Sequence, residues 1–127
     1  MQAFGLAVAA LGATVGLQGS EVEASGSQCG RASWYKMGHT TANGERMNAN
    51  ALAATHRSLP FGTKVRVQNL ANGRSVVVRI NDRGPFVGGR VIDVTRGAAE
   101  HLGMIRSGTA KVKVTVVEGD ADLSGCS

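Results

Sequence analysis

The stretch that decides the fold class is TKVRVQNLANGRSVVVRIND, residues 63–82. In its first half, Val65 and Val67 alternate with charged or polar neighbours, which is typical of a half-buried strand. Asn72-Gly73 follows, and this pair favours a tight hairpin turn because both residues tolerate positive φ. In the return strand, residues 75–81, one face carries Val76, Val78 and Ile80. The stretch therefore predicts an antiparallel β-hairpin.

One further strand and one short helix are predicted downstream of the hairpin. Residues 111–117 alternate valine with Lys or Thr and predict the last strand of the sheet. Before that strand, Thr95 is placed to cap a helix, and Gly103 is placed to end it. The small apolar face of this helix consists of Ala98, Ala99 and Leu102. We expect the helix to cover the sheet.

Composition sets the size and class of the domain. The chain has 127 residues and 43% hydrophobic content, which suits one compact domain. It contains 18 glycines and only five aromatic residues. This balance favours short strands and tight turns over a helical bundle, so we expect an all-β fold.

Residues 1–24 are predicted to be a signal peptide. Residues 3–17 are apolar or small, about the length of a secretory hydrophobic region. Val22-Glu23-Ala24 ends on a small residue, as a cleavage site does, so the mature chain would begin near Ser25 as a single domain, residues 25–127. No Lys or Arg precedes Arg31, which leaves a buried N-terminal strand as the alternative. We expect an exported protein, in the periplasm or outside the cell.

The mature domain is expected to be basic. All 14 Lys and Arg residues lie after residue 30, whereas two of the nine acidic residues, Glu21 and Glu23, precede the cleavage site. The mature net charge is then 14 − 7 = +7. Outside the cytoplasm, the polyanions available to such a domain are wall polymers, anionic lipids and the carboxylates of peptide stems. We expect a wall partner and no nucleic acid, although a merely solvated basic surface would also explain the charge.

Two cysteines, Cys29 and Cys126, bracket almost the whole mature chain. In an exported protein an even number of cysteines at the two ends suggests a disulfide, which stabilises by about 2–4 kcal/mol. Residues 123–126 look like a lipidation motif, but they lie near the C-terminal end of the sequence with no apolar helix before them. We therefore expect no stable membrane anchor, and a monomer.

The most informative segment for chemistry is residues 79–86. In it, Asp82 stands where an apolar strand runs into a Gly-Pro turn, a position that holds a side chain rigidly at the rim of a barrel. The alternative is an Asx-turn, in which Asp82 only accepts backbone N–H groups or pairs with Arg83. Asp93 has a similar setting but leads towards a helix, so we interpret it as a loop or cap ligand.

Other polar and aromatic residues are candidates for the same site. Glu45 and His56 form a possible polar cluster with Asp82, although each could be an ordinary surface residue. The three histidines show no paired ligand spacing, so we expect no metal, and no motif indicates a cofactor. Trp34 and Tyr35 are adjacent, so in a strand one packs inside while the other lies on a groove, where a sugar ring could stack on it.

Seven ordered blocks between Gly30 and about Val117 resemble the rare lipoprotein A family. The resemblance implies a six-stranded double-psi β-barrel, the fold also found in expansins and barwin-like proteins. The blocks are residues 32–35 (ASWY), 41–45 (TANGE), 53–56 (AATH), 59–67 (LPFGTKVRV), 72–76 (NGRSV), 79–86 (RINDRGPF) and 89–93 (GRVID).

The resemblance also implies site residues and an activity. The family's acidic residue matches Asp82, the general acid and base, and its supporting polar residues match Glu45 and His56. The activity implied is a peptidoglycan lytic transglycosylase, which cleaves the β-1,4 bond between N-acetylmuramic acid and N-acetylglucosamine and leaves a 1,6-anhydro end. One carboxyl group can serve both proton transfers, unlike the two carboxylates of ordinary glycosidases.

The surroundings of the acid decide its strength. Burial beside Phe86 would raise the pKa of Asp82, whereas contact with Arg83 would lower it. Substrate contacts are assigned to Trp34, Tyr35 and Arg83. Two other interpretations use the same fold: a non-catalytic, expansin-like module that binds cell-wall glycan, and a secreted effector or inhibitor.

Overall fold

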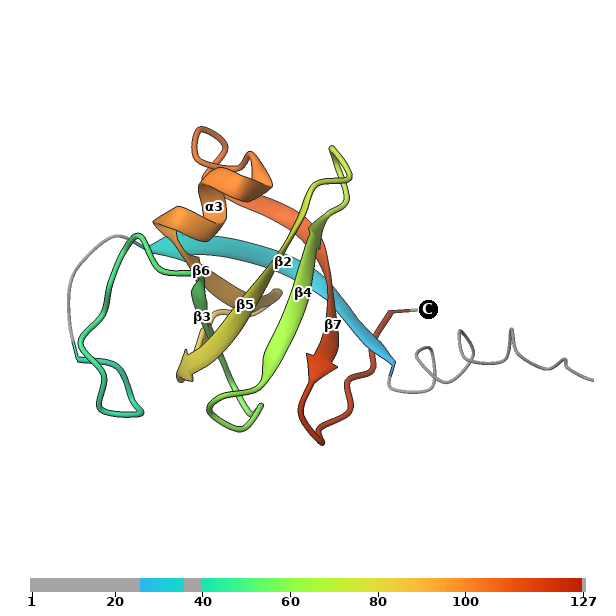
Figure 1. Ribbon diagram of the computed structural model, residues 1–127. Helices are drawn as coiled ribbons and strands as arrows, with labels where there is room; N and C mark the ends of the chain where they lie inside the picture. The colour runs from blue at the N-terminus through green and yellow to red at the C-terminus, as the bar shows by residue number, and fades with distance from the viewer. Residues whose placement is uncertain (1–25, 36–39, 127) are drawn as a thin grey trace, which may run out of the picture.

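A computed structural model describes residues 26–35 and 40–126 of the chain. Within these residues, six strands form a closed barrel and one short helix, α3 (Arg96–Leu102), covers it (Figure 1). The strands are β2 (Ser27–Tyr35), β3 (Ala53–His56), β4 (Lys64–Asn69), β5 (Ser75–Asp82), β6 (Arg90–Thr95) and β7 (Thr109–Glu118). The all-β fold class and the six-stranded barrel are confirmed.

The barrel is mixed, with the strand order β2-β6-β3-β5-β4-β7. Two pairs are parallel, β2 with β6 and β3 with β5, and the other neighbours are antiparallel. Closure leaves no free sheet edge, which removes the usual template for aggregation. The parallel pairs bring together segments that are far apart in the sequence, and the candidate site is built where one of these pairs ends.

Alternating valines fill the interior of the barrel, as the sequence pattern predicts. In β4 and β5 every second side chain is buried, whereas the residues between them face outward. The hairpin pairs Val67 with Val76 and Val65 with Val78. The central residues, all with almost no exposed surface, include Val65, Val67, Val78, Ile80, Ile92, Val94, Val112 and Val114.

The predicted helix and its caps are confirmed. The Thr95 side chain accepts a hydrogen bond from the Ala98 amide, and Gly103 ends α3 in the left-handed region at φ 68°. The helix buries its small apolar face at one end of the barrel, and in Figure 1 it lies away from the end of β5. The side-chain amides of Asn69 and Asn72 both donate to the Leu102 carbonyl, at 2.9 and 3.0 Å.

The disulfide is also confirmed. Cys29 in β2 bonds to Cys126, across 97 positions of sequence. The disulfide joins the segment after β7 to β2, the first strand of the barrel, so both ends of the described chain lie on the same side (Figure 1). The predicted signal peptide, residues 1–24, lies outside the described residues. Within the described residues, no helix has the length and apolar character needed to cross a membrane.

Candidate active site on the outer wall of the barrel

A β-bulge places Asp82 on the outer wall of the barrel. Ala54 of β3 pairs with Ile80, but the next residue, Thr55, pairs with Asp82, so Asn81 is the extra residue in β5. Strict alternation would turn Asp82 inward, like Ile80, and one inserted residue reverses the direction of every side chain after it. The bulge therefore converts an interior position into an exterior one at the end of the strand.

The Asp82 carboxyl is held by backbone amides. Its Oδ1 accepts hydrogen bonds from the amides of Ala42 and Arg83, both at 2.9 Å. The Ala42 bond joins the end of β5 to the loop of residues 40–46, which is 40 positions earlier in the sequence. The Arg83 bond is the kind of local contact that the Asx-turn interpretation predicts. The same two bonds also fix the orientation of the carboxyl group.

Asp82 belongs to a row of outward-facing side chains that crosses four strands. Thr55 lies between Asp82 on β5 and Asp93 on β6, and Ser33 of β2 pairs with Asp93. Two residues beyond Ser33, the Tyr35 hydroxyl lies near the Thr55 side chain. Burial raises the pKa of Tyr35, the Thr55 side chain opposes this shift, and the nearby charges of Asp82 and Asp93 raise the pKa further. Tyr35 is therefore a neutral hydrogen-bonding group beside the acid.

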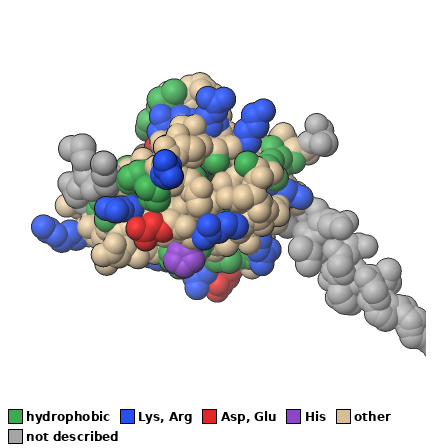
Figure 2. Space-filling view, turned by 90° about the horizontal axis from the view of Figure 1, so that it is seen from above, with side chains coloured by type: hydrophobic (Ala, Val, Ile, Leu, Met, Phe, Trp, Pro, Cys, Tyr) green, Lys and Arg blue, Asp and Glu red, His purple; other side chains and the backbone are tan. Residues whose placement is uncertain are grey.

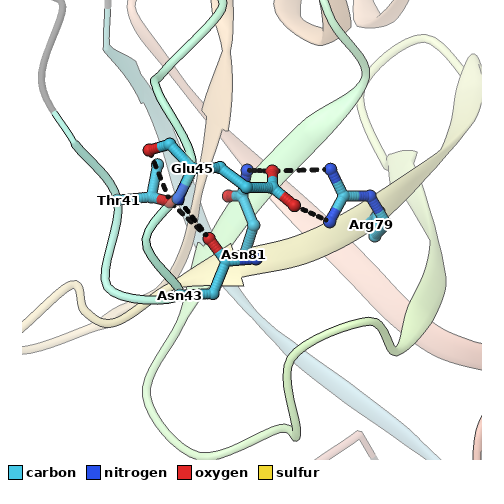
Figure 3. A network of polar contacts seen from close by, with 5 residues as sticks. All are labelled: Thr41, Asn43, Glu45, Arg79 and Asn81. Carbon is cyan, nitrogen blue, oxygen red and sulfur yellow. Dashed lines mark hydrogen bonds and ion pairs between the residues drawn. The ribbon is translucent and has the colours of Figure 1, made fainter.

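Glu45 is the centre of a polar network that holds the 40–46 loop against β5 (Figure 3). Its two carboxylate oxygens accept from the two terminal nitrogens of Arg79, at 2.9 and 2.8 Å, and Oε1 also accepts from Asn81. The Arg79 guanidinium, with help from Asn81 and Asn43, lowers the pKa of Glu45 to about 2. Glu45 is therefore a carboxylate at neutral pH and cannot donate a proton there.

His56 is buried behind the site, with only 3% of its surface exposed. Its Nδ1 accepts from the amides of Ser58 and Leu59, at 3.1 and 3.2 Å, so the proton of the neutral ring is on Nε2, which donates to Gln28 Oε1 at 2.8 Å. Burial lowers the pKa of His56 to about 4, and the positive charges of Arg83 and Arg57 act in the same direction. Nδ1 thus supports the turn that follows β3, and Nε2 links the end of β3 to β2.

Arg83 lies over an aromatic ring. Its guanidinium carbon is 4.0 Å from the centroid of Phe61, and Nη1 donates to the His56 carbonyl at 3.3 Å. Such stacking is typical of arginine because its planar head is weakly hydrated. Arg83 therefore connects the end of β5 to the turn after β3.

The loop of residues 83–90 is anchored by one side chain and presents an exposed ring. Arg57 donates from Nε to the Pro85 carbonyl at 2.6 Å, and from Nη2 to the carbonyls of Val87 and Arg90 at 3.1 and 3.4 Å. Phe86, between these anchors, is 78% exposed. Most of the Phe86 ring therefore faces solvent, and Asp82 itself is partly buried.

Gly84 brings this loop close to the row of outward-facing side chains. It has φ 123°, and a Cβ placed on it would be 3.2 Å from the Thr55 methyl group and 3.6 Å from the Phe86 ring. Phe86 is thus a neighbour of the Thr55 and Asp82 pair. Exposed large aromatic rings are costly on a protein surface, and sugar-binding sites use them as stacking platforms.

Trp34 and Tyr35 face opposite sides of β2, as their adjacency predicts. Trp34 packs against the core cluster, whereas Tyr35 belongs to the outer wall. Asp93 differs from expectation: it lies within β6, where both of its oxygens accept from Arg90 at 2.8 and 2.9 Å. The helix cap is Thr95, two residues later, because the strand continues past Asp93.

The structure brings Asp82 and the Glu45 loop together, and it places His56 in a supporting layer behind them. Sequence reasoning missed the contacts of Arg79 and Arg57 and the exposure of Phe86. Alternation in residues 75–81 predicts that Arg79 lies on the outer face, where it can pair with an acidic side chain. No local pattern predicts which acidic residue this is. Among the described residues, no group of three His, Cys, Asp or Glu side chains could hold a metal ion.

Comparisons with known proteins agree with this geometry. Residues 27–114 match a protein family described as lytic transglycolase. A probable endolytic peptidoglycan transglycosylase RlpA from Synechocystis sp. is 61% identical over 92 residues, which is 70% of this chain and 29% of that protein. An endolytic peptidoglycan transglycosylase RlpA from Neisseria meningitidis serogroup A is 52% identical over 91 residues, 69% of this chain and 38% of that protein. The chain thus spans well under half the length of these curated relatives.

Solved structures with low sequence identity share the fold. A Streptomyces papain inhibitor has a TM-score of 0.61 at 20% identity, covering 72% of this chain and 94% of the inhibitor. A Clavibacter michiganensis expansin mutant in complex with cellohexaose has a TM-score of 0.58 at 23% identity, covering 76% of this chain and 53% of the expansin. These structures support the double-psi barrel fold alone. From the family match and the close relatives, the chain belongs to the RlpA-like, double-psi β-barrel family of lytic transglycolases.

Proposed function

We propose that the protein is a peptidoglycan lytic transglycosylase that cleaves the bond between N-acetylmuramic acid and N-acetylglucosamine. The observation that carries the proposal is the position of Asp82, turned to the outer wall by the bulge and oriented by two backbone amides. Of the other carboxylates near it, Glu45 is bound to Arg79 and Asp93 to Arg90. Asp82 is the group to which we assign proton transfer.

In the first step, protonated Asp82 gives its proton to the glycosidic oxygen. The bond between this oxygen and muramyl C1 breaks, and the leaving N-acetylglucosamine keeps the proton as a free hydroxyl group. Positive charge develops on C1 and its ring oxygen, next to the carboxylate that Asp82 has become. A carboxylate at this position stabilises the charge as it forms.

In the second step, the C6 hydroxyl oxygen of the same muramyl residue bonds to C1. The Asp82 carboxylate takes the proton that this hydroxyl loses, which returns Asp82 to its starting state. The product is a 1,6-anhydro ring, and no water is consumed. One carboxyl group is sufficient, whereas hydrolysis with a second carboxylate needs a water or a covalent intermediate.

The neighbouring residues support the acid without sharing its task. Glu45 holds the 40–46 loop, whose Ala42 amide orients Asp82. His56 keeps the turn after β3 in place, and its carbonyl accepts from Arg83. We propose that substrate contacts come from Tyr35, Arg83 and the exposed ring of Phe86, while Trp34 supports β2 from the core side.

The proposed setting is the cell wall. Export would follow removal of residues 1–24, and the disulfide is consistent with an oxidising compartment such as the periplasm or the extracellular space. We propose that the domain acts as a monomer on glycan strands, with no nucleic acid as a partner.

A second candidate function is non-catalytic, expansin-like binding of wall glycan. The exposed Phe86 favours it, because a ring that grips a sugar serves binding equally well without cleavage. The two functions differ in their products and not in their affinity for the wall.

Digestion of purified sacculi separates the two functions. The protein is incubated with sacculi with and without stem peptides, and soluble products are identified by mass spectrometry. We expect anhydromuramyl ends from the wild type and none from Asp82→Asn, whereas Asp120→Asn, an exposed carboxylate after β7, serves as the matched control. Binding without release of products would favour the expansin-like function, and anhydromuramyl products from Asp82→Asn would remove Asp82 from the acid role.

A further inference from the structure

A groove of about 710 Å³ lies on the outer wall, beyond the residues assigned to catalysis. It runs between β2, β7 and the end of the 83–90 loop. Residues that line it include Cys29, Arg31, Leu70, Val87, Arg90 and Lys111. None of the proposed roles above uses this groove.

The groove concentrates positive charge. Arg31 of β2 is directly opposite Lys111 of β7, and on its other side it is opposite Arg90 of β6. Like charges directly opposite one another destabilise a sheet. Arg90 is neutralised by Asp93 at 2.8 Å, but no acidic side chain in the described part of the chain forms an ion pair with Arg31 or Lys111. The two exposed cations therefore favour an anionic ligand.

The rest of the groove suits a ligand that is also bulky and largely uncharged. Leu70 and Val87, at its edges, are 51% and 53% exposed. At Gly88 and Gly89, a Cβ would meet no atom within 4 Å, so a ligand can approach the backbone closely there. Apolar edges with cations between them match a sugar that carries a carboxylate better than a small inorganic anion.

The 83–90 loop connects the Asp82 site to the groove, because it leaves the end of β5 and its residues 87–90 line the groove. The row from Asp82 through Thr55 and Asp93 reaches Ser33 of β2, two residues from Arg31. The three strand spacings between β5 and β2 correspond to about 14 Å along the wall. The ion pair of Arg90 and Asp93 adjoins both regions. A polymer whose scissile bond lies at Asp82 can therefore extend into the groove.

We propose that Arg31 and Lys111 form a carboxylate-binding subsite for the glycan strand. This inference rests on the proposed function, since it takes the wall glycan as the polymer. The carboxylate has two sources in such a strand: the lactyl group of a muramic acid without a peptide, and the stem peptide where one is attached. Charge-assisted hydrogen bonds from arginine and lysine recognise either source.

The test compares two double variants that remove the same charge. Arg31→Gln with Lys111→Gln removes the subsite, whereas Arg66→Gln with Lys113→Gln removes two exposed cations of β4 and β7 outside the groove. This control is needed because the face in Figure 2 carries Lys and Arg side chains at several separate places. Binding is measured with soluble glycan fragments by NMR titration at low and physiological salt. The fragments are peptide-free, stem-bearing, or peptide-free with their carboxylates converted to methyl esters.

We expect the groove variant to bind carboxylate-bearing fragments roughly threefold to tenfold more weakly than the control variant at low salt. Methyl esters should bind both variants equally. Loss confined to peptide-free fragments would assign the subsite to the lactyl carboxylate, and loss confined to stem-bearing fragments would assign it to the peptide. Equal binding of all fragments by the two variants, or undiminished binding of the methyl esters by the wild type, would overturn the proposal.

These experiments distinguish a failure of the proposed subsite from a failure of the proposed cleavage activity. The titrations need no turnover, so a wild-type protein that releases no product still reports on the groove. With cleavage measured in parallel, the groove variant should raise KM and leave kcat within about twofold, because its cations lie away from the reacting atoms. A fall in kcat at unchanged KM would place Arg31 and Lys111 in catalysis and contradict a binding subsite.

Discussion

At the scale of single residues, the two acidic side chains that the family resemblance singles out have different hydrogen-bond donors. Glu45 is bound through both oxygens by Arg79, whereas Asp82 is oriented by backbone amides. An ion pair keeps a carboxylate charged, and hydrogen bonds from amides fix its direction. We propose that Glu45 supports the loop and that Asp82 transfers the proton, as the family resemblance implies.

His56 makes stability depend on pH. Its pKa is about 4 in the folded protein and 6.5 in the unfolded chain, so between these values the unfolded chain binds the extra proton. The contribution of neutral His56 is fully present above pH 6.5 and is lost as pH falls towards 4, by roughly 3 kcal/mol at most. We expect the free energy of unfolding, measured in urea, to fall over this window.

The control for this prediction is His56→Gln, which can still make hydrogen bonds but does not titrate. It should be less stable than the wild type at pH 7 and show a flatter dependence between pH 6.5 and 4. A wild type with equal stability at both ends of the window would contradict the assigned pKa of His56.

Phe86 is expected to act as a stacking platform. Phe86→Leu keeps an apolar side chain but removes the flat ring, so affinity for glycan fragments should fall about fivefold to tenfold. Phe86→Tyr should retain most of the affinity. Because the ring is 78% exposed, thermal unfolding should change little in either variant. If Phe86→Leu binds glycan as the wild type does, the ring has no part in binding.

At this scale, the sequence could predict which residues belong to the candidate site, but it could not predict most of their contacts. The motif around Asp82 predicted that this residue is the acid, whereas local spacing alone favoured a turn residue. The pairing of Glu45 with Arg79 joins positions 34 apart, and no periodicity specifies such a contact. The exposure of Phe86 depends on the arginine that anchors its loop, which is 28 positions from Pro85.

At the scale of elements, the bulge at Asn81 and the 83–90 loop decide the direction of the functional side chains. Arg57 holds the loop by donating hydrogen bonds to three carbonyl groups. A lysine has a shorter side chain and a single ammonium group, so it cannot make the same three bonds. Arg57→Lys should therefore loosen residues 84–89. We expect faster hydrogen exchange confined to this segment, weaker glycan binding, and a loss of about 1–2 kcal/mol in the free energy of unfolding.

The matched control is Arg74→Lys, since Arg74 is also exposed and donates to a single carbonyl, that of Glu100. It should leave exchange in the 83–90 loop unchanged. Equal exchange rates in the wild type and Arg57→Lys would show that other contacts hold the loop.

The elements that sequence could predict are those specified locally. Alternating valines, the Asn72-Gly73 turn and the caps of α3 each depend on residues within a few positions of one another, and all are confirmed. The bulge could not be predicted, because it exists only in the pairing of β5 with β3. The likeness to a known family supplied the six-stranded barrel fold, which local patterns do not specify.

At the scale of the whole molecule, the disulfide closes a loop of almost the entire described chain. Cys29→Ser with Cys126→Ser should lower the free energy of unfolding by about 2–4 kcal/mol, because the unfolded chain gains freedom when a loop of 97 positions opens. Urea unfolding with and without reductant measures this change in the free energy of unfolding. Reductant should destabilise the wild type and leave the double variant unchanged; a wild type insensitive to reductant would mean that the bond contributes no stability.

The central claim concerns the whole reaction: a bond of the wall glycan is broken by one carboxyl group without the addition of water. The most direct measurement is digestion of sacculi in water labelled with heavy oxygen, followed by mass spectrometry of the released muramyl ends. We predict anhydro ends that carry no heavy oxygen, formed by the wild type and absent with Asp82→Asn. Reducing muramyl ends that contain heavy oxygen would show hydrolysis and contradict the account.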